Sequence, residues 1–203
     1  MKRLAILLSA LLFSLSAFAG GGGWFGRFHP GVEWGMSITP ASFHHYNYLD
    51  ESIGFRINDE GWDYHTKLGA FILGSVNFDV TRTFSVGLLS GCQGVESGRR
   101  IVPLITRLSF YLSGKEDDSI FVYTDLGIAL DDLSKKCNLC QIGSGYHLIL
   151  TPAYSLSFRI SGRIVFDHPD VWDPIEEDYI SERNIKRNDA WYCALNMGFS
   201  LEF

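Results

Sequence analysis

The sequence is dominated by segments in which apolar and polar residues alternate with a period of two. Eight such segments follow one another, separated by stretches rich in Gly, Pro, Ser and charged residues. Alternation of this kind places one class of residue on each face of a β-strand. The pattern predicts an all-β chain of eight strands, and 203 residues suit a single domain. The expected strands are residues 31–39, 67–79, 83–91, 102–112, 120–130, 145–151, 156–166 and 191–203.

The first 19 residues are predicted to be a signal peptide. Lys2 and Arg3 precede an apolar run over residues 4–15, and Ala17-Phe18-Ala19 fits a small-x-small cleavage site. A buried helix or a membrane anchor is the alternative, but the apolar run is short for a spanning helix and four glycines follow it. We therefore expect export, with residues 20–203 as the mature domain.

The polar faces of the strands indicate which side lies inside the barrel. The apolar faces point inward in a soluble barrel and toward lipid in a membrane barrel. Here the polar faces combine many Gly and Ser residues with four acids and four bases. Such a set can fill a narrow lumen with ion pairs, whereas Gly would weaken a water-facing strand. The charged members are Glu33, Lys67, Asp79, Arg107, Asp125, Arg159, Arg163 and Glu202. We expect a lumen network in which Arg107, Arg159 and Arg163 meet Glu33, Asp125 or Glu202.

Short and long connections alternate along the chain. Residues 80–82, 113–119 and 152–155 are short polar turns, whereas 40–66 and 167–190 are the longest connections. This arrangement is typical of an outer-membrane barrel with both termini in the periplasm and four loops outside. An even number of strands also closes without leaving an edge in hydrocarbon. The predicted fold is an eight-stranded antiparallel up-and-down transmembrane β-barrel.

The last eight residues carry the most specific motif. Residues 196–203, Asn-Met-Gly-Phe-Ser-Leu-Glu-Phe, place Gly198, Leu201 and Phe203 in a polar-x-Gly-x-x-apolar-x-aromatic pattern. The motif resembles the terminal strand signal of bacterial outer-membrane β-barrels, in particular the small OmpX-like and OmpA-barrel-like proteins and the barrels of Bacteroidetes-type bacteria. The resemblance implies a Gram-negative outer membrane, contact with its lipid and lipopolysaccharide, and recognition by the barrel assembly machinery.

The compartment into which the protein is exported helps to predict whether its four cysteines form disulfides. Cys137 and Cys140 form a C-x-x-C motif in the expected third outer loop. Redox or metal chemistry would be the interpretation in the cytosol, whereas export favours a small loop disulfide. Cys92 and Cys193 lie on strands that are not neighbours, so we expect both to be unpaired.

The two longest connections are acidic and aromatic. They are either solvated loops kept soluble by their charge, or a surface for cation-assisted contact with lipopolysaccharide or a host ligand. The formal charge of −6 argues against nucleic acid.

The sequence predicts neither a catalytic site nor a cofactor or metal site. His147 and Ser144 suggest an acyl hydrolase that modifies lipid A, but the alternation places His147 on the lumen face. A secreted lipocalin-like barrel is the other alternative, and it would need an apolar cavity. We expect a structural or surface-interaction platform whose side-chain-filled lumen leaves no wide pore.

Overall fold

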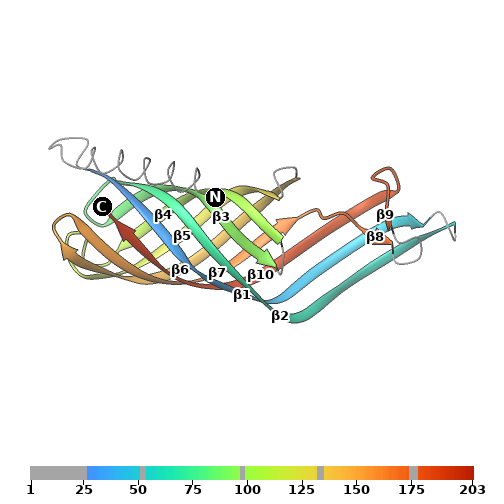
Figure 1. Cartoon of the computed structure of the whole chain (residues 1–203), viewed down its shortest axis with the longest axis horizontal. Coiled ribbons are helices and arrows are strands. Elements are labelled where there is room, and N and C mark those ends of the chain that lie inside the picture. Colours follow the sequence, from blue (N-terminus) through green and yellow to red (C-terminus); the bar gives the residue numbers. More distant parts are fainter. Residues whose placement is uncertain (1–26, 51–53, 97–98, 132–134, 174–177) are drawn as a thin grey trace, which may run out of the picture.

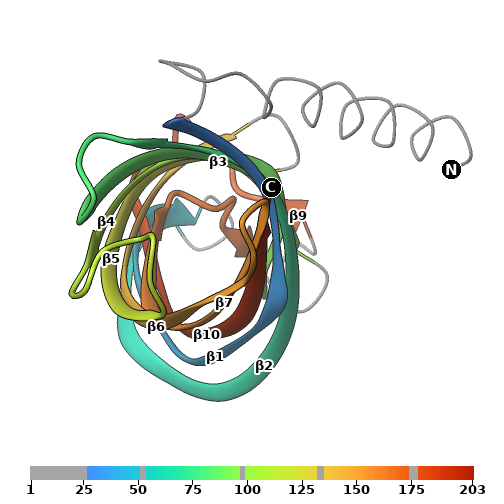
Figure 2. The same cartoon turned by 90° about the vertical axis from the view of Figure 1, so that its left-hand side faces the viewer.

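A computed structural model describes residues 27–50, 54–96, 99–131, 135–173 and 178–203, so the expected signal peptide lies outside the described residues. The described residues form a closed barrel of eight antiparallel strands in the ring order β1-β10-β7-β6-β5-β4-β3-β2 (Figures 1 and 2). The barrel strands are β1 (Phe28–Asp50), β2 (Phe55–Asp79), β3 (Phe84–Glu96), β4 (Arg99–Tyr111), β5 (Ser119–Asp131), β6 (Lys135–Thr151), β7 (Tyr154–Asp167) and β10 (Ile185–Glu202). The predicted eight-stranded up-and-down barrel is confirmed.

Two short strands lie outside the ring, in the connection between β7 and β10. These are β8 (Trp172–Asp173) and β9 (Asp178–Tyr179), which pair with each other. The three tight connections and the C-terminus lie at one end of the barrel, which we call the turn end (Figure 1).

The strand faces are inverted relative to those of a water-soluble protein. Met36, Leu104 and Leu126 point outward and are 58%, 56% and 56% exposed. Arg107 and Asp125 point inward and are 2% and 0% exposed. Charged side chains are rarely fully buried and large apolar side chains usually are, so this barrel turns its apolar face to its surroundings.

Strands β1 and β2 are much longer than predicted. They contain 23 and 25 residues, whereas β3 and β4 contain 13 each. Their outer parts pair from Ala41↔Tyr64 to Asp50↔Phe55. β10 pairs with β1 along the same stretch, from Ile185 onward. We call this three-stranded extension (41–50, 55–66 and 185–190) the arm, and it projects beyond the rest of the barrel in Figure 1.

The prediction of a loop over residues 40–66 was therefore wrong. The arm has polar and aromatic residues on both faces, for example His44-His45-Tyr46-Asn47-Tyr48. Without one apolar face, the period-two pattern disappears from the sequence although the strand continues. Bulges at the base of the arm, between Ile38 and Ala41, also shift the register.

The lumen holds a large apolar cluster near the arm and most of its charged groups toward the turn end. A buried cluster near the arm end includes Leu73, Leu89, Ile105, Leu139 and Val165. These residues share the inward faces with the predicted polar set. The lumen is therefore filled mainly by apolar side chains toward the arm, and toward the turn end by charged groups and a second buried cluster of Tyr111, Phe121 and Tyr123.

Candidate functional site: the charged lumen and the arm

Arg107 on β4 is the centre of the lumen charge network. Its Nε and Nη2 donate to the two carboxylate oxygens of Asp125 on β5, at 2.6 and 2.7 Å. Its Nη1 donates to Glu33 on β1 at 2.5 Å. The guanidinium also lies 4.5 Å from the ring centre of Tyr123. The bidentate geometry is the strongest form of an Arg–carboxylate pair, and it ties β4 to its neighbour and to the far wall of the barrel.

Arg159 on β7 connects this centre to the turn end. Its Nη1 lies 3.7 Å from Glu33, and its Nη2 lies 3.6 Å from Glu202 on β10. The guanidinium covers the rings of Phe121 and Tyr123 at 5.0 and 5.3 Å. These distances place Glu33 between two arginines, as charge balance inside a low-dielectric lumen requires.

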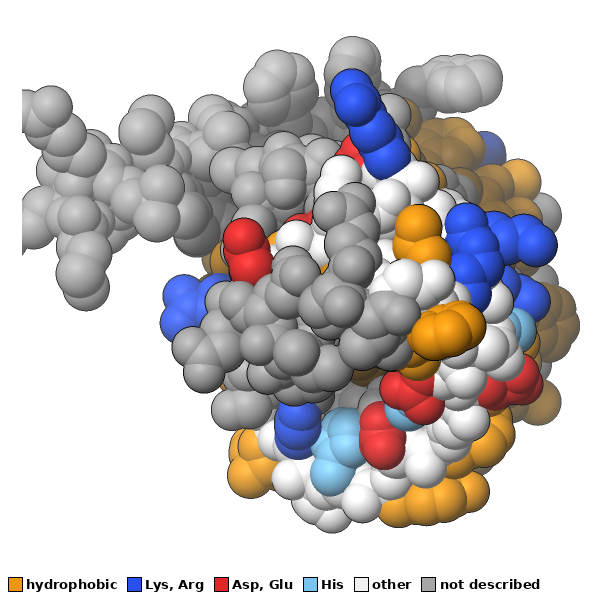
Figure 3. Space-filling model, turned by 90° about the vertical axis from the view of Figure 1, so that its right-hand side faces the viewer, with side chains coloured by type: hydrophobic (Ala, Val, Ile, Leu, Met, Phe, Trp, Pro, Cys, Tyr) orange, Lys and Arg blue, Asp and Glu red, His pale blue; other side chains and the backbone are white. Residues whose placement is uncertain are grey.

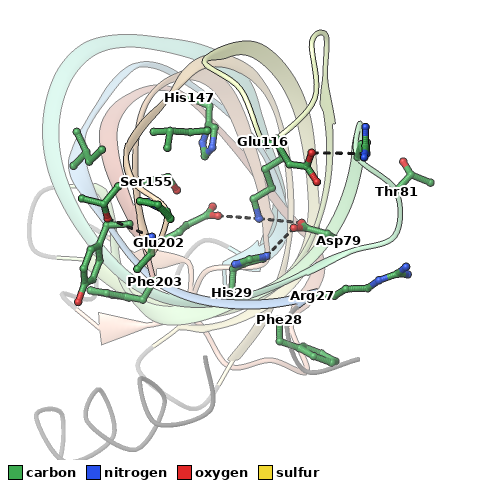
Figure 4. Close-up of a pocket in the computed structure, with 18 of the residues that line it drawn as sticks. Arg27, Phe28, His29, Asp79, Thr81, Glu116, His147, Ser155, Glu202 and Phe203 are labelled. Carbon is green, nitrogen blue, oxygen red and sulfur yellow. Dashed lines mark hydrogen bonds and ion pairs between the residues drawn. The ribbon is translucent and has the colours of Figure 1, made fainter. Parts of the chain in front are cut away.

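Lys115 completes the network at the turn end, from the turn between β4 and β5. Its Nζ lies 2.9 Å from Asp79 and 3.0 Å from Glu202, and His29 lies 2.8 Å from the same Asp79 (Figure 4). Burial alone would lower the pKa of Lys115, but Glu202 and the neighbouring acidic groups hold it above its usual value. The sequence prediction missed Lys115 because alternation ends where the turn begins.

The turn geometry explains how Lys115 enters the barrel mouth. Gly114 adopts φ = +102°, which residues with a side chain rarely adopt. The next amide, of Lys115, donates to the carbonyl of Arg82 in the β2–β3 turn at 2.8 Å. Lys115 is thus fixed at the edge of an open cavity of about 980 Å³, lined also by Glu202 and His147.

Arg163 differs from the prediction, because it forms no ion pair with an acid among the described residues. Its Nη2 donates instead to the carbonyl oxygen of Gly94 on β3, at 3.2 Å. Ser37 donates to the same carbonyl at 3.4 Å, and Thr39 donates to that of Val95 at 2.8 Å. Side chains from β1 and β7 therefore hold the end of β3 across the lumen.

The position of Arg163 along β7 explains this difference. It lies four residues beyond Arg159, about 13 Å further along the strand. At that level its cross-strand neighbours are Ala194 on β10 and the buried Gln141 on β6, neither of which is an acid. Glu33, Asp125 and Glu202 lie closer to the turn-end termini of their strands than Arg163 does. Alternation identifies the face of a residue, but it does not identify its level in the barrel.

His147 lies on the lumen side, and Ser144 faces outward on the same strand. The two residues are therefore not a pair. His147 Nδ1 instead lies 3.0 Å from the hydroxyl of Ser157, which is 0% exposed. A nucleophile buried to this degree is inaccessible to an acyl chain, so the geometry does not favour the acyl-hydrolase alternative.

The predicted loop disulfide between Cys137 and Cys140 is not formed. Both residues belong to β6 rather than to a loop, and all four cysteines are thiols. Cys137 is buried in the lumen and Cys140 is exposed on the opposite face. Residues three apart on a strand point to opposite sides, so a disulfide would require β6 to unfold locally. Cys92 and Cys193 also have no disulfide.

The arm carries a second polar cluster around His44. Its Nδ1 lies 3.1 Å from Asp63 and its Nε2 lies 3.4 Å from Asp59, both on β2. The ring stacks on Tyr46 with centres 5.2 Å apart. These residues border a cavity of about 510 Å³, which Lys67 also lines. Figure 3 shows acidic and histidine side chains side by side at this end of the molecule. Lys67, which we expected in the lumen network, therefore lies at the cavity beneath the arm.

Aromatic side chains cluster on the outer surface at the base of the arm. Phe43 lies 5.3 Å from both Trp62 and Trp191, and Trp191 lies 5.6 Å from Phe166. The register places these four residues on adjacent strands, β2, β1, β10 and β7. They form a continuous aromatic row across half of the barrel.

The turn end carries a second aromatic group, which includes the C-terminal residue. Phe203 packs edge-on against Tyr154 at 5.8 Å, and its amide donates to the carbonyl of Pro30 at 2.8 Å. Phe28 and Phe78 lie 4.8 Å apart on the same rim. The last residue of the terminal motif is thus an outer rim residue.

The other two motif residues have distinct positions. Leu201 is half-buried on the outward face. Gly198 faces the lumen opposite Gly35 and beneath the ring of Phe71. A Cβ on Gly198 would lie 2.7 Å from Phe71 Cζ and 2.6 Å from the carbonyl oxygen of Trp34. This glycine is required by lumen packing, whatever its part in assembly.

Among the described residues, no group of three or more His, Cys, Asp or Glu side chains is arranged to hold a metal ion. Nor does any helix formed by these residues have the length and apolar character needed to cross a membrane.

No protein-family model matches the chain, and no curated protein matches it. The solved structures that resemble it include three outer-membrane proteins. Outer membrane protein AlkL, determined in DMPC lipid bilayers, is 14% identical over 85% of this chain and 90% of its own, with a TM-score of 0.39. Neisserial surface protein A is 11% identical over 87% and 97%, with a TM-score of 0.40. The outer membrane protease OmpT from Escherichia coli is 8% identical over 87% and 96%, with a TM-score of 0.40. These resemblances assign no activity, ligand or family to this chain, so the OmpX-like relationship stays a prediction.

Proposed function

We propose that this protein is an integral outer-membrane β-barrel that displays the arm and its neighbouring loops outside the cell. The observation that carries the proposal is a belt of large apolar side chains around a barrel whose lumen contains buried charges. Contiguous apolar surface of this extent indicates a membrane or a protein partner. A ring that closes around the whole barrel matches lipid, because lipid surrounds a protein on all sides. The belt includes Trp34, Met36, Ile38, Leu68, Ile72, Leu88, Leu104, Leu108, Leu126, Ile128, Ile142, Leu148, Ile160, Ile164, Leu195, Met197 and Phe199.

The height of the belt supports this environment. Tyr154 on the turn-end rim and Phe166 in the arm-end row are twelve positions apart on β7. At about 3.3 Å per residue this is about 40 Å along the strand, or about 30 Å along the barrel axis at a tilt of about 40°. The hydrocarbon core of a bilayer has about the same thickness. Aromatic residues at both borders are typical of membrane interfaces.

The lumen supports a role other than that of a wide pore. Arg107, Arg159 and Lys115 occupy it together with their acids, and the apolar cluster closes it toward the arm. An eight-stranded barrel has room for side chains and little else. We therefore propose a structural platform for surface interaction. A lipocalin-like carrier would need an apolar cavity, and here the large apolar faces point outward.

The orientation follows from the same argument. The short turns and the C-terminus share one end, which we place in the periplasm of a Gram-negative cell, and the arm projects outside. The terminal motif would then be recognised by the assembly machinery from the periplasmic side. Removal of residues 1–19 during export belongs to this proposal.

Depth-dependent fluorescence quenching tests the proposal. We would refold the mature chain into bilayers that contain lipids brominated on their acyl chains. One variant keeps only Trp34, which lies in the belt, and the matched control keeps only Trp172, which lies on β8 outside the barrel. All other tryptophans are replaced by Phe. We expect strong quenching of Trp34 and little quenching of Trp172. Equal quenching of both variants, or a folded barrel that stays soluble without detergent or lipid, would contradict the proposal.

A further inference from the structure

The arm has an open β-sheet edge. β2 pairs with β3 only from Phe71 to Asp79, whereas its pairing with β1 continues to Phe55. Over residues 55–64, no strand of the described chain pairs with the edge of β2 that faces away from β1. Figure 1 shows β2 along the border of the arm. An edge of this length presents a row of backbone donors and acceptors that an added strand can satisfy.

The edge segment is acidic on both faces. Residues 55–64 contain three acids and one base. Alternation places Asp59 and Asp63 on the face that carries His44, and Glu60 on the opposite face together with Trp62 and Tyr64. Trp62 and Tyr64 are stacked and are 49% and 81% exposed. Lys or Arg side chains of an added strand would meet carboxylates on one face, and a carboxylate with aromatic rings on the other.

The cavity beneath the arm lies next to this edge. Asp59 and Asp63 belong both to the edge and to the lining of the 510 Å³ cavity. In strand addition, backbone pairing provides affinity and pockets for alternate side chains provide specificity. A long basic side chain at every second position of the added strand could enter the cavity and reach these two carboxylates.

We propose that the β2 edge of the arm binds an extended basic polypeptide segment, which adds to the sheet as a fourth strand. The inference rests on the proposed function, because it needs the arm to lie outside the membrane. A basic segment fits this edge better than a second copy of the chain does. Two copies would bring together two segments of net charge −2, which repel each other. The chemistry that recognises the partner is an extended backbone with alternating Lys or Arg residues.

The test uses the full mature barrel refolded in detergent and a fluorescent ten-residue probe of alternating lysine and valine. Two matched probes accompany it. One replaces lysine with glutamate, and the other is N-methylated at alternate residues, which removes the backbone donors along one edge. The barrel variant is Glu60→Gln with Asp63→Asn. Its control is Asp178→Asn with Glu182→Gln, which makes the same charge change in the connection between β7 and β10.

We expect the lysine probe to bind and the glutamate probe not to bind. N-methylation of the lysine probe, and separately the arm variant, should each weaken binding about tenfold or more, as loss of charge-assisted and backbone hydrogen bonds implies. The control variant should bind like the unmodified barrel. A ¹³C-carbonyl-labelled lysine probe should also show an infrared band shifted by coupling to the sheet.

Equal binding of the methylated and unmodified probes would overturn the inference, because attraction by charge alone would explain it. Equal weakening by the control variant, self-association through the edge, or no binding would overturn it as well. Heat-modifiable gel migration of the same samples reports whether the barrel is folded. A barrel that passes the quenching test and fails to bind therefore refutes this inference without refuting the membrane barrel.

Discussion

Arg163 on β7 donates a hydrogen bond across the lumen to the carbonyl oxygen of Gly94 on β3. In the ring order these two strands lie four positions apart in either direction, so the contact joins opposite walls. Arg163 is 1% exposed, and its Nε and Nη1 have no hydrogen-bond partner within the described part of the chain. A buried guanidinium with one backbone acceptor is poorly compensated compared with Arg107, which meets two carboxylates.

Replacing Arg107 and Arg163 separately with Met should therefore have different effects. Arg107→Met leaves Glu33 and Asp125 buried with reduced compensation, so we expect it to lower the free energy of unfolding by about 3–5 kcal/mol. Arg163→Met removes an under-satisfied buried charge, and we expect a change of about 1 kcal/mol or less, or stabilisation. Urea titration in detergent, followed by tryptophan fluorescence, measures both.

Two results would contradict this comparison. One is a loss of stability in Arg163→Met as large as that in Arg107→Met. The other comes from the double variant Arg107→Met with Asp125→Asn. We expect this variant to recover part of the stability lost in Arg107→Met, because it removes one of the two carboxylates left without a partner. No recovery would mean that Arg107 acts through packing rather than charge.

Lys115 should stabilise the barrel up to an unusually alkaline pH. The pKa of Lys115 is higher in the folded barrel than in the unfolded chain. Its contribution to the free energy of unfolding is therefore fully present below the unfolded pKa, which is about 10.4. That contribution is lost as the pH rises through the higher folded pKa. We expect the urea midpoints of the unmodified barrel and Lys115→Met to differ by a constant amount from pH 7 to about pH 10. The difference should narrow only above that range.

Lys115→Gln provides the control for side-chain volume, and both variants should behave alike if charge is the cause. A difference that already disappears between pH 8 and pH 9 would contradict the paired state of Lys115. That result would mean that the ammonium does not meet Asp79 and Glu202 in the folded barrel.

Gly198 should affect the stability of the purified barrel as well as any assembly step. Gly198→Ala places a methyl group against Phe71 and the Trp34 carbonyl, so we expect a loss of about 1–3 kcal/mol from overpacking. The measurement is refolding and urea titration of purified protein, without assembly machinery. Gly162 has open space around its Cβ position, so Gly162→Ala is the matched control and should be close to neutral. An unchanged stability in Gly198→Ala would assign the glycine to assembly alone.

Local pattern was sufficient to predict the barrel but not all of its strands. Each expected strand lies within or largely overlaps an observed one, because one apolar face against one polar face is visible residue by residue. The arm was missed because both of its faces are polar, so nothing in His44 to Tyr48 distinguishes a strand from a loop. The C-x-x-C motif was misplaced for a related reason, since Gly, Gln and Asn around Cys137 and Cys140 obscured the alternation of β6.

The sequence by itself determined that the chain forms alternating strands, which residues face the lumen, and that charge inside the barrel is nearly balanced. These properties depend on the parity of each residue along its own strand. Only the tertiary structure decided that Arg107 meets Glu33 and Asp125, that Arg163 meets a carbonyl instead of an acid, and that a turn residue, Lys115, enters the mouth. Those contacts depend on strand register and on the level of each side chain along the barrel axis. Both are set by backbone pairing between strands as far apart in sequence as β1 and β10, where Gly31 lies opposite Glu202, and neither is encoded in parity.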